Sequence, residues 1–313
     1  MGRKANGSRT SLPRLSTDKM AGLPHIHSQG GNVKIFKLLF GAVLLLAVGF
    51  SHAFADPITW VQENGNNIGT VNLSTGAVNI IGNANVSSTL LDIGFDGIGN
   101  LYGIGGVNSQ TYGFYSINQS TAQATLIGTT GIQGLNALAY GNGTFYAATN
   151  QNANLYSVNP VTGAATAIGQ IGSGGFTSAG ALAFFNGSLY FSATTSVGSG
   201  GSQTSNSLLI QVDPNNPANS ATVGSIDYPG VRALAVLNGV LYGFSNPYID
   251  GTAGTQIISI NTTTGAGTFV ANYADGNVAV VGAATSPVPL PGAILLLAPG
   301  LLGLAAVRRR FKG

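Results

Sequence analysis

The chemistry open to this chain is limited by the side chains that its central stretch lacks. Between residues 56 and 287 the sequence contains no Cys, His or Lys, and its only basic residue is Arg232. Nucleophiles paired with histidine, lysine Schiff bases and histidine metal sites are therefore excluded from this stretch. A P-loop lysine and a G-x-G-x-x-G motif between strand and helix are also missing. Carboxylates, hydroxyls, amides and one guanidinium remain.

One candidate group lies in the segment LLDIGFDGIGN. Asp92, Asp96 and Asn100 carry oxygen atoms that could bind Ca²⁺, and the two carboxylates could act as a pair. The spacing lacks the alternate-residue pattern of a calcium loop, so an aspartate that stabilises a hairpin turn is the simpler interpretation. We expect no cofactor, with Ca²⁺ as the alternative.

A second group recurs at one place in successive segments, beside a repeated Ala-Leu-Ala. Asn136, Gly180 and Arg232 directly precede this tripeptide, Asp92 takes the same place if a one-residue gap falls beside it, and Asn277 would complete the set. If the segments are inner strands of a ring, these residues line one mouth of its channel and form a candidate binding site. The alternative is a structural salt bridge of Arg232, with Asp92 as its partner.

These residues belong to a sequence repeat. Segments that contain a tight turn followed by Leu-Tyr or Phe-Tyr recur about every 40 to 50 residues. They are FDGIGNLYGI, AYGNGTFYAA, FFNGSLYFSA and VLNGVLYGFS, with Tyr102, Tyr146, Tyr190 and Tyr242. The longest interval holds the polar stretch TSVGSGGSQTSNS, which indicates a loop insertion. Because these aromatics recur with the repeat, we expect them to be core residues, together with Phe95, Tyr140, Phe184 and Val236.

Each repeat contains four short strands. Residues 135–169 show them as LNALAY, TFYAAT, NLYSVNP and AATAIG. Asn-Gly supplies the positive φ angles of a two-residue hairpin, and β-branched and aromatic residues dominate the strands. Four-stranded units at this period are typical of a β-propeller.

The two ends of the repeat region complement each other. Residues 58–82 resemble the second, third and fourth strands of a blade, and residues 278–284 resemble a first strand. The sequence therefore predicts an all-β, five-bladed propeller over 56–286, closed by pairing of its N- and C-terminal strands.

The region before the repeats is typical of an export signal. Lys34 and Lys37 precede an apolar run, and Ala53 and Ala55 precede Asp56, as at a cleavage site for signal peptidase. We predict a signal peptide over 33–55. Residues 1–32 form a predicted disordered extension, and a true start at Val33 is the alternative.

Charge separates the repeats from the ends. Residues 56–287 carry eight acidic residues and one arginine, a net charge of −7, whereas the basic residues gather near the termini. The basic pI of the whole chain therefore does not indicate a nucleic-acid partner.

The C-terminal tail combines three features. An uncharged stretch over 292–307, a predicted transmembrane helix, is preceded by a short motif and followed by an arginine cluster. These residues are Val288, Pro289, Leu290, Pro291, Arg308, Arg309 and Arg310.

The tail, 287–313, resembles the PEP-CTERM sorting signals of Gram-negative bacteria in their VPLP variant. Gly292 stands where the variant often has Ala. The resemblance implies membrane anchoring in transit, processing by an exosortase, and delivery to the cell surface or an exopolysaccharide matrix.

We therefore expect an exported, non-enzymatic propeller that serves as a scaffold or binding module, possible ligands being the exopolysaccharides of a biofilm. The alternative is a carboxylate-dependent polysaccharide hydrolase or lyase, which needs Asp92, Asp96 or Asp227 to converge at the channel mouth.

Overall fold

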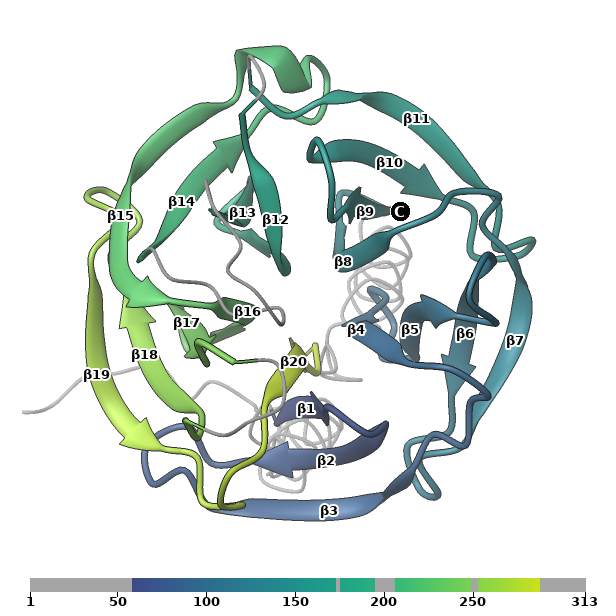
Figure 1. Cartoon of the computed structure of the whole chain (residues 1–313), viewed down its shortest axis with the longest axis horizontal. Coiled ribbons are helices and arrows are strands. Elements are labelled where there is room, and N and C mark those ends of the chain that lie inside the picture. The colour runs from purple at the N-terminus through teal and green to yellow at the C-terminus, as the bar shows by residue number, and fades with distance from the viewer. Residues whose placement is uncertain (1–57, 173–174, 195–205, 249–252, 288–313) are drawn as a thin grey trace, which may run out of the picture. The chain divides into compact units, whose positions relative to one another are not determined.

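A computed structural model describes residues 58–172, 175–194, 206–248 and 253–287. These residues form five antiparallel sheets of four strands each, arranged around a central axis (Figure 1). From the axis outward, blade 1 is β20 (Val280–Thr285), β1 (Thr59–Glu63), β2 (Asn67–Val71) and β3 (Val78–Asn83). Blade 2 is β4 (Leu90–Phe95), β5 (Leu101–Gly106), β6 (Tyr112–Ile117) and β7 (Ala124–Thr129).

The other three blades follow in chain order. Blade 3 is β8 (Leu135–Gly141), β9 (Thr144–Thr149), β10 (Asn154–Val158) and β11 (Ala165–Gln170). Blade 4 is β12 (Thr177–Phe185), β13 (Ser188–Thr194), β14 (Asn206–Val212) and β15 (Ala221–Pro229), with a 3-10 turn at Pro217–Asn219. Blade 5 is β16 (Val231–Leu237), β17 (Val240–Ser245), β18 (Gln256–Ile260) and β19 (Gly267–Asn272). The predicted five-bladed propeller is confirmed.

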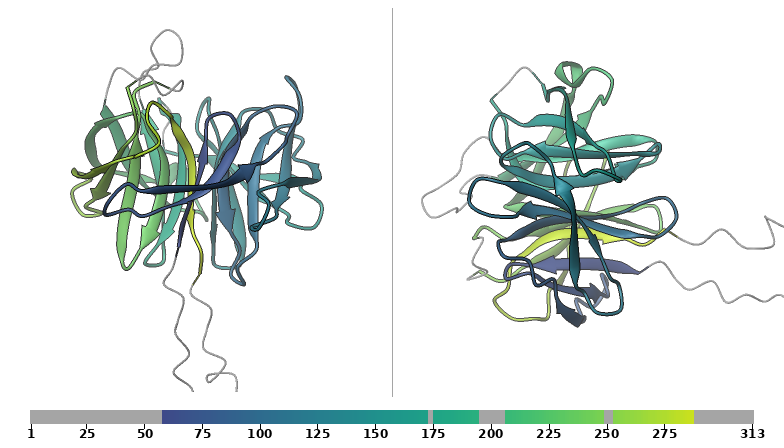
Figure 2. Two further views of the ribbon diagram at one scale, coloured as in Figure 1. Left: turned by 90° about the horizontal axis from the view of Figure 1, so that it is seen from below. Right: turned by 90° about the vertical axis from the view of Figure 1, so that its right-hand side faces the viewer.

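Strands from the two ends of the repeat region close the ring. β20 pairs with β1 in antiparallel register, with Thr59 opposite Thr285. Beyond the pair, the Ile58 N–H donates to Ser286 Oγ at 3.1 Å, and the Ser286 N–H donates to the Ile58 carbonyl at 2.9 Å. β1 therefore begins, and β20 ends, on one face of the ring, which we call the terminal face (Figure 2). The inner strands start on the opposite face.

The hairpin turns follow the predicted chemistry. In three blades an Asn-Gly pair with positive φ at both residues joins the inner strand to the second strand. Both residues of such a turn need left-handed backbone, which Asn and Gly adopt at least cost. The pairs are Asn142-Gly143, Asn186-Gly187 and Asn238-Gly239.

The core lies between adjacent blades. Between blades 2 and 3, Phe114 and Phe145 pack edge to face with their ring centres 5.3 Å apart, and Tyr102 stacks on Phe114. The other repeated tyrosines also pack against core clusters, Tyr146 between blades 3 and 4, Tyr190 between 4 and 5, and Tyr242 between 5 and 1. All four tyrosines thus pack against the core as predicted, with Tyr190 buried and the other three partly buried.

The predicted targeting segments lie outside the described residues. This applies to the extension 1–32, the signal peptide 33–55 with Ala53, Ala55 and Asp56, and the tail with its motif, helix and arginines. Most of the polar insertion that follows β13 also lies outside the described residues. Within the described part of the chain, no helix is long and apolar enough to cross a membrane.

Candidate functional site

The candidate site is built around a β-bulge that recurs in all five inner strands. The strand register breaks at corresponding places, at Leu91, Asn136, Gly180, Arg232 and Val281. A bulged residue is left out of the ladder and its side chain is re-aimed. Asn136, Gly180 and Arg232 thus occupy equivalent positions near the starts of their inner strands, toward the opposite face.

Two other candidates lie elsewhere. Asp92 is one residue further along its strand, opposite Ile104, so Leu91 holds the bulge position in blade 2. Asn277 is exposed in the bend before β20, and Val281 holds the position in blade 1. The ring of equivalent residues is therefore mostly apolar.

Asp92 is a buried link between three blades. Its side chain is 1% exposed, and its Oδ1 accepts from the Ile93 N–H at 2.8 Å. Its Oδ2 accepts from the Leu138 N–H at 2.7 Å in blade 3, and the carboxyl also bonds the Ala283 N–H in blade 1. Burial raises the pKa of Asp92 well above its ordinary value, against the opposing effect of these amides. A carboxyl held in this way links strands and is closed to a substrate.

The predicted ion pair of Arg232 with Asp92 is not formed, because the carboxyl is used by backbone amides. Arg232 is 8% exposed, and its Nε donates to the Asn246 carbonyl at 3.2 Å. Burial lowers the pKa of Arg232 to about 10, which leaves the guanidinium charged at neutral pH. The Oδ1 of Asn136 is buried without a hydrogen-bond partner among the described residues.

Asp96 stabilises a turn on the terminal face. Its Oδ1 accepts from the Ile98 N–H at 3.0 Å and the Asn100 N–H at 2.8 Å, and its Oδ2 accepts from Asn100 Nδ2 at 2.8 Å. Burial raises the pKa of Asp96, but the hydrogen bonds outweigh it and hold the pKa below its ordinary value. The turn-stabilising interpretation is confirmed.

The carboxylates that a hydrolase or lyase would need do not converge. Asp92 lies within β4 and Asp96 directly follows its last residue, so their Cα atoms are about 13 Å apart at the rise of a strand. Asp227 lies in β15, the outermost strand of blade 4. The described residues also contain no cluster of three or more Asp, Glu, His or Cys side chains that could hold a metal ion.

The sequence did not lead us to expect a buried acid at Glu63, the one glutamate of the chain. Glu63 is fully buried where β1 ends on the opposite face, and its Oε1 accepts from the Tyr273 hydroxyl at 2.8 Å. Its Oε2 accepts from Asn67 Nδ2 at 3.1 Å. Burial raises the pKa of Glu63, and the nearby carboxyl of Asp275 raises it further. The available signal was a single glutamate at the end of the predicted strand segment ITWVQE.

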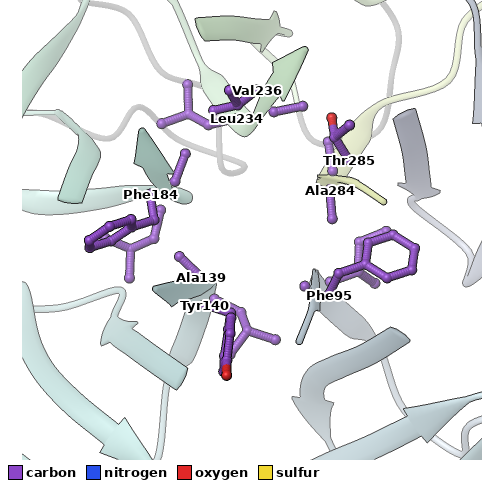
Figure 3. A pocket seen from close by; sticks show the side chains of 15 residues that line it. Phe95, Ala139, Tyr140, Phe184, Leu234, Val236, Ala284 and Thr285 are labelled. Carbon is purple, nitrogen blue, oxygen red and sulfur yellow. The ribbon is translucent and has the colours of Figure 1, made fainter. Parts of the chain in front are cut away.

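The channel itself is narrow on the terminal face. A cavity of about 110 Å³ lies among the ends of the five inner strands, with Phe95, Tyr140 and Phe184 around it (Figure 3). At about 30 Å³ for a water molecule, it holds a few waters and is too small for a sugar chain. Tyr140, Phe184 and Val236, predicted as core, are only partly buried at this rim.

The comparisons with known proteins show only a similarity of fold. No family model matches the chain, and no curated protein matches it. A chain from a nidogen/laminin complex is 10% identical with a TM-score of 0.46, covering 74% of this chain and 98% of that one. TolB from Acinetobacter baumannii is 13% identical with a TM-score of 0.42, covering 80% and 71%. A protein of unknown function from Bacteroides caccae is 11% identical with a TM-score of 0.45, covering 74% and 99%. Values this low say nothing of what the present chain binds.

Proposed function

We propose that the protein is an exported, surface-sorted β-propeller that serves as a non-enzymatic binding or scaffold component of an extracellular polysaccharide matrix. The observation that carries the proposal is the position of the chain ends. Ile58 and Ser286 are hydrogen-bonded to each other on the terminal face. An anchor that follows Pro287 would therefore hold the ring by this face and leave the opposite face exposed.

Three further features support the proposal. The tail resembles a PEP-CTERM signal, which implies exosortase processing and release from the inner membrane to the surface. The carboxylates required by the enzymatic alternative lie apart. The surface of the repeats is rich in Asn, Thr and Ser and poor in charge, which suits hydrogen bonding to neutral sugars.

The sorting step is tested in the native bacterium with the full chain. The mature mass and the cell fraction are measured for the wild type, for a Pro289→Ala/Pro291→Ala variant, and for Pro160→Ala in an exposed turn as a control. We expect the wild type and the control to be processed and to appear in the surface or matrix fraction. The double variant should stay in the inner-membrane fraction at higher mass.

Two results would overturn this proposal. One is intact wild-type chain in the cytosol, with neither signal removed. The other is normal processing and surface delivery of the double variant, which would make the Val-Pro-Leu-Pro motif irrelevant to sorting.

A further inference from the structure

We propose that a cleft between blades 2 and 3, on the opposite face, binds a neutral carbohydrate through Tyr112 and Tyr156. This inference rests on the proposed function, and it assigns the carbohydrate ligand of that function to this cleft. The cleft has a volume of about 380 Å³, within the range of small-ligand sites, and none of its lining residues is charged. We call it the blade 2–3 cleft.

The two tyrosines form an aromatic wall. Tyr112 begins β6 in blade 2 and Tyr156 lies in β10 in blade 3, and both are partly exposed. Each packs against the core cluster between the blades that contains Phe114 and Phe145. Both side chains thus line the cleft while packing against this cluster, and an aromatic ring that borders a cleft can receive the apolar C–H face of a sugar ring.

A matched residue shows that this exposure is particular to blade 3. Tyr115 in β6 corresponds to Tyr156 in β10, because both precede Ser and both lie at the register break with the fourth strand. Tyr115 is 5% exposed and its hydroxyl donates to the Gly106 carbonyl at 3.1 Å. The Tyr156 hydroxyl has no hydrogen bond within the described part of the chain. One position thus serves the core in blade 2 and faces the cleft in blade 3.

Amide side chains complete the lining. Gln133 donates through its Nε2 to the backbone carbonyl and to the Oε1 of Gln110, both at 2.9 Å, which holds it in place. The side chains of Gln151 and Asn154 make no hydrogen bond to other described residues. Thr149 Oγ1 donates to the Gln151 carbonyl at 2.9 Å and shapes the loop beside them. Uncharged donors and acceptors beside an aromatic wall match the hydroxyls of a neutral sugar and give no site for a charged ligand.

A larger cleft between blades 1 and 5 is less suited to the role. It has a volume of about 650 Å³ and is also uncharged, but Tyr242 is its one aromatic residue. It lies on the terminal face and includes Ile58, where the chain enters the ring. An anchor on that face would hinder a polymer there, whereas the blade 2–3 cleft faces away from it.

The test uses the mature protein, or the full chain in detergent if no processing occurs. Binding is measured by calorimetry against neutral gluco-, manno- and galacto-tetraoses, with an oligogalacturonate as the acidic comparison. We expect binding to at least one neutral probe and none to the acidic one. Tyr112→Ala and Tyr156→Ala should each weaken it at least about tenfold.

Tyr248→Ala is the control, because this tyrosine is 44% exposed in blade 5, away from the cleft; it should bind like the wild type. If Tyr156→Ala fails to fold, Gln151→Ala and Asn154→Ala replace it, and each should weaken binding several-fold at an unchanged melting temperature.

Two adverse results are distinguishable, one against the carbohydrate ligand and one against its location in the cleft. A surface-located wild type that binds none of the neutral probes, or that prefers the acidic one, overturns the carbohydrate assignment while sorting stands. Unchanged binding by folded cleft variants places the sugar elsewhere and leaves the proposed function intact.

Discussion

Asp92 shows how one buried carboxyl can organise a propeller. Inner strands present unpaired amides to the central axis, since they have no neighbour on that side. Asp92 accepts hydrogen bonds from Ile93, Leu138 and Ala283, and so connects blades 2, 3 and 1. Gly282 packs tightly against it, because a Cβ there would lie 2.8 Å from the Asp92 Cα.

Replacing this carboxyl should destabilise the fold. In Asp92→Ala the N–H groups of Leu138 and Ala283 would lose their acceptor, and a buried donor left unpaired costs about 1–3 kcal/mol. We expect the free energy of unfolding in urea to fall by about 2 kcal/mol or more. Asp96→Asn, which keeps the Oδ1 acceptor of an exposed turn, should change it by less than about 0.5 kcal/mol. Equal stability of the two variants would contradict the role assigned to Asp92.

The two buried acids also determine a pH dependence. Burial raises the pKa of both Glu63 and Asp92, so the folded state holds their protons more tightly than the unfolded state. Their contribution is full below the ordinary carboxyl pKa and is lost as pH rises through the raised values. Unfolding free energy should therefore increase as pH is lowered through the raised values toward the ordinary carboxyl pKa.

Glu63→Gln removes one titrating group and should flatten this rise. The lowered pKa of Asp96 acts in the opposite sense, but only below its ordinary value, outside this interval. Urea unfolding of both proteins across the interval is the measurement. Stability that grows with pH in the wild type would be the opposite of the expectation.

At the scale of elements, the outer turns interlock neighbouring blades. After β10, Asn159 Oδ1 accepts from the Val161 and Thr162 N–H groups at 2.8 and 3.2 Å. Gly163 then turns the chain with a φ of +76° against the backbone of Gly128 in blade 2. A turn of the same form follows β2, β6 and β18. Each of these turns connects the third strand of its blade to the fourth and also contacts a neighbouring blade.

Two glycine substitutions separate these roles. Gly163→Ala and Gly143→Ala both place a side chain at positive φ, at a cost of about 1–2 kcal/mol. A Cβ at Gly143 meets nothing within 4 Å, whereas one at Gly163 lies 2.8–3.0 Å from the Gly128 backbone. Gly163→Ala should therefore lose about 1–3 kcal/mol more in urea unfolding, as overpacking does. Equal losses would show that the blade contact is loose.

The sequence repeat made the strands and turns predictable. The candidate site was harder to predict, because it depends on how the blades pack. Strands, Asn-Gly turns and the closing strand could be predicted because each blade repeats the same local chemistry. The place of Asp92 could not, because a one-residue bulge decides whether it or Leu91 aligns with Asn136. The blade 2–3 cleft also escaped, since nothing near Tyr156 in sequence distinguishes it from the buried Tyr115.

At the scale of the whole molecule, closure determines which face a tethered propeller presents. The pairing of β1 with β20 replaces a disulfide in a chain without cysteine, and it brings both ends of the ring to the terminal face. If the proposed C-terminal anchor holds the ring by this face, the blade 2–3 cleft lies on the side that is directed away from the anchor. The closed ring, and the orientation that we propose for it, thus depend on one strand pair.

An engineered disulfide across that pair tests the account most directly. Thr59 and Thr285 are opposite each other with their Oγ1 atoms 3.2 Å apart, and the native chain has no cysteine to compete. We predict that Thr59→Cys/Thr285→Cys oxidises fully in the folded protein and gains up to about 4 kcal/mol against unfolding. The control Thr59→Cys/Thr144→Cys, whose second site is in blade 3, should keep both thiols. Thiols that persist in the first protein, or a disulfide that forms as readily in the control, would contradict the closed ring.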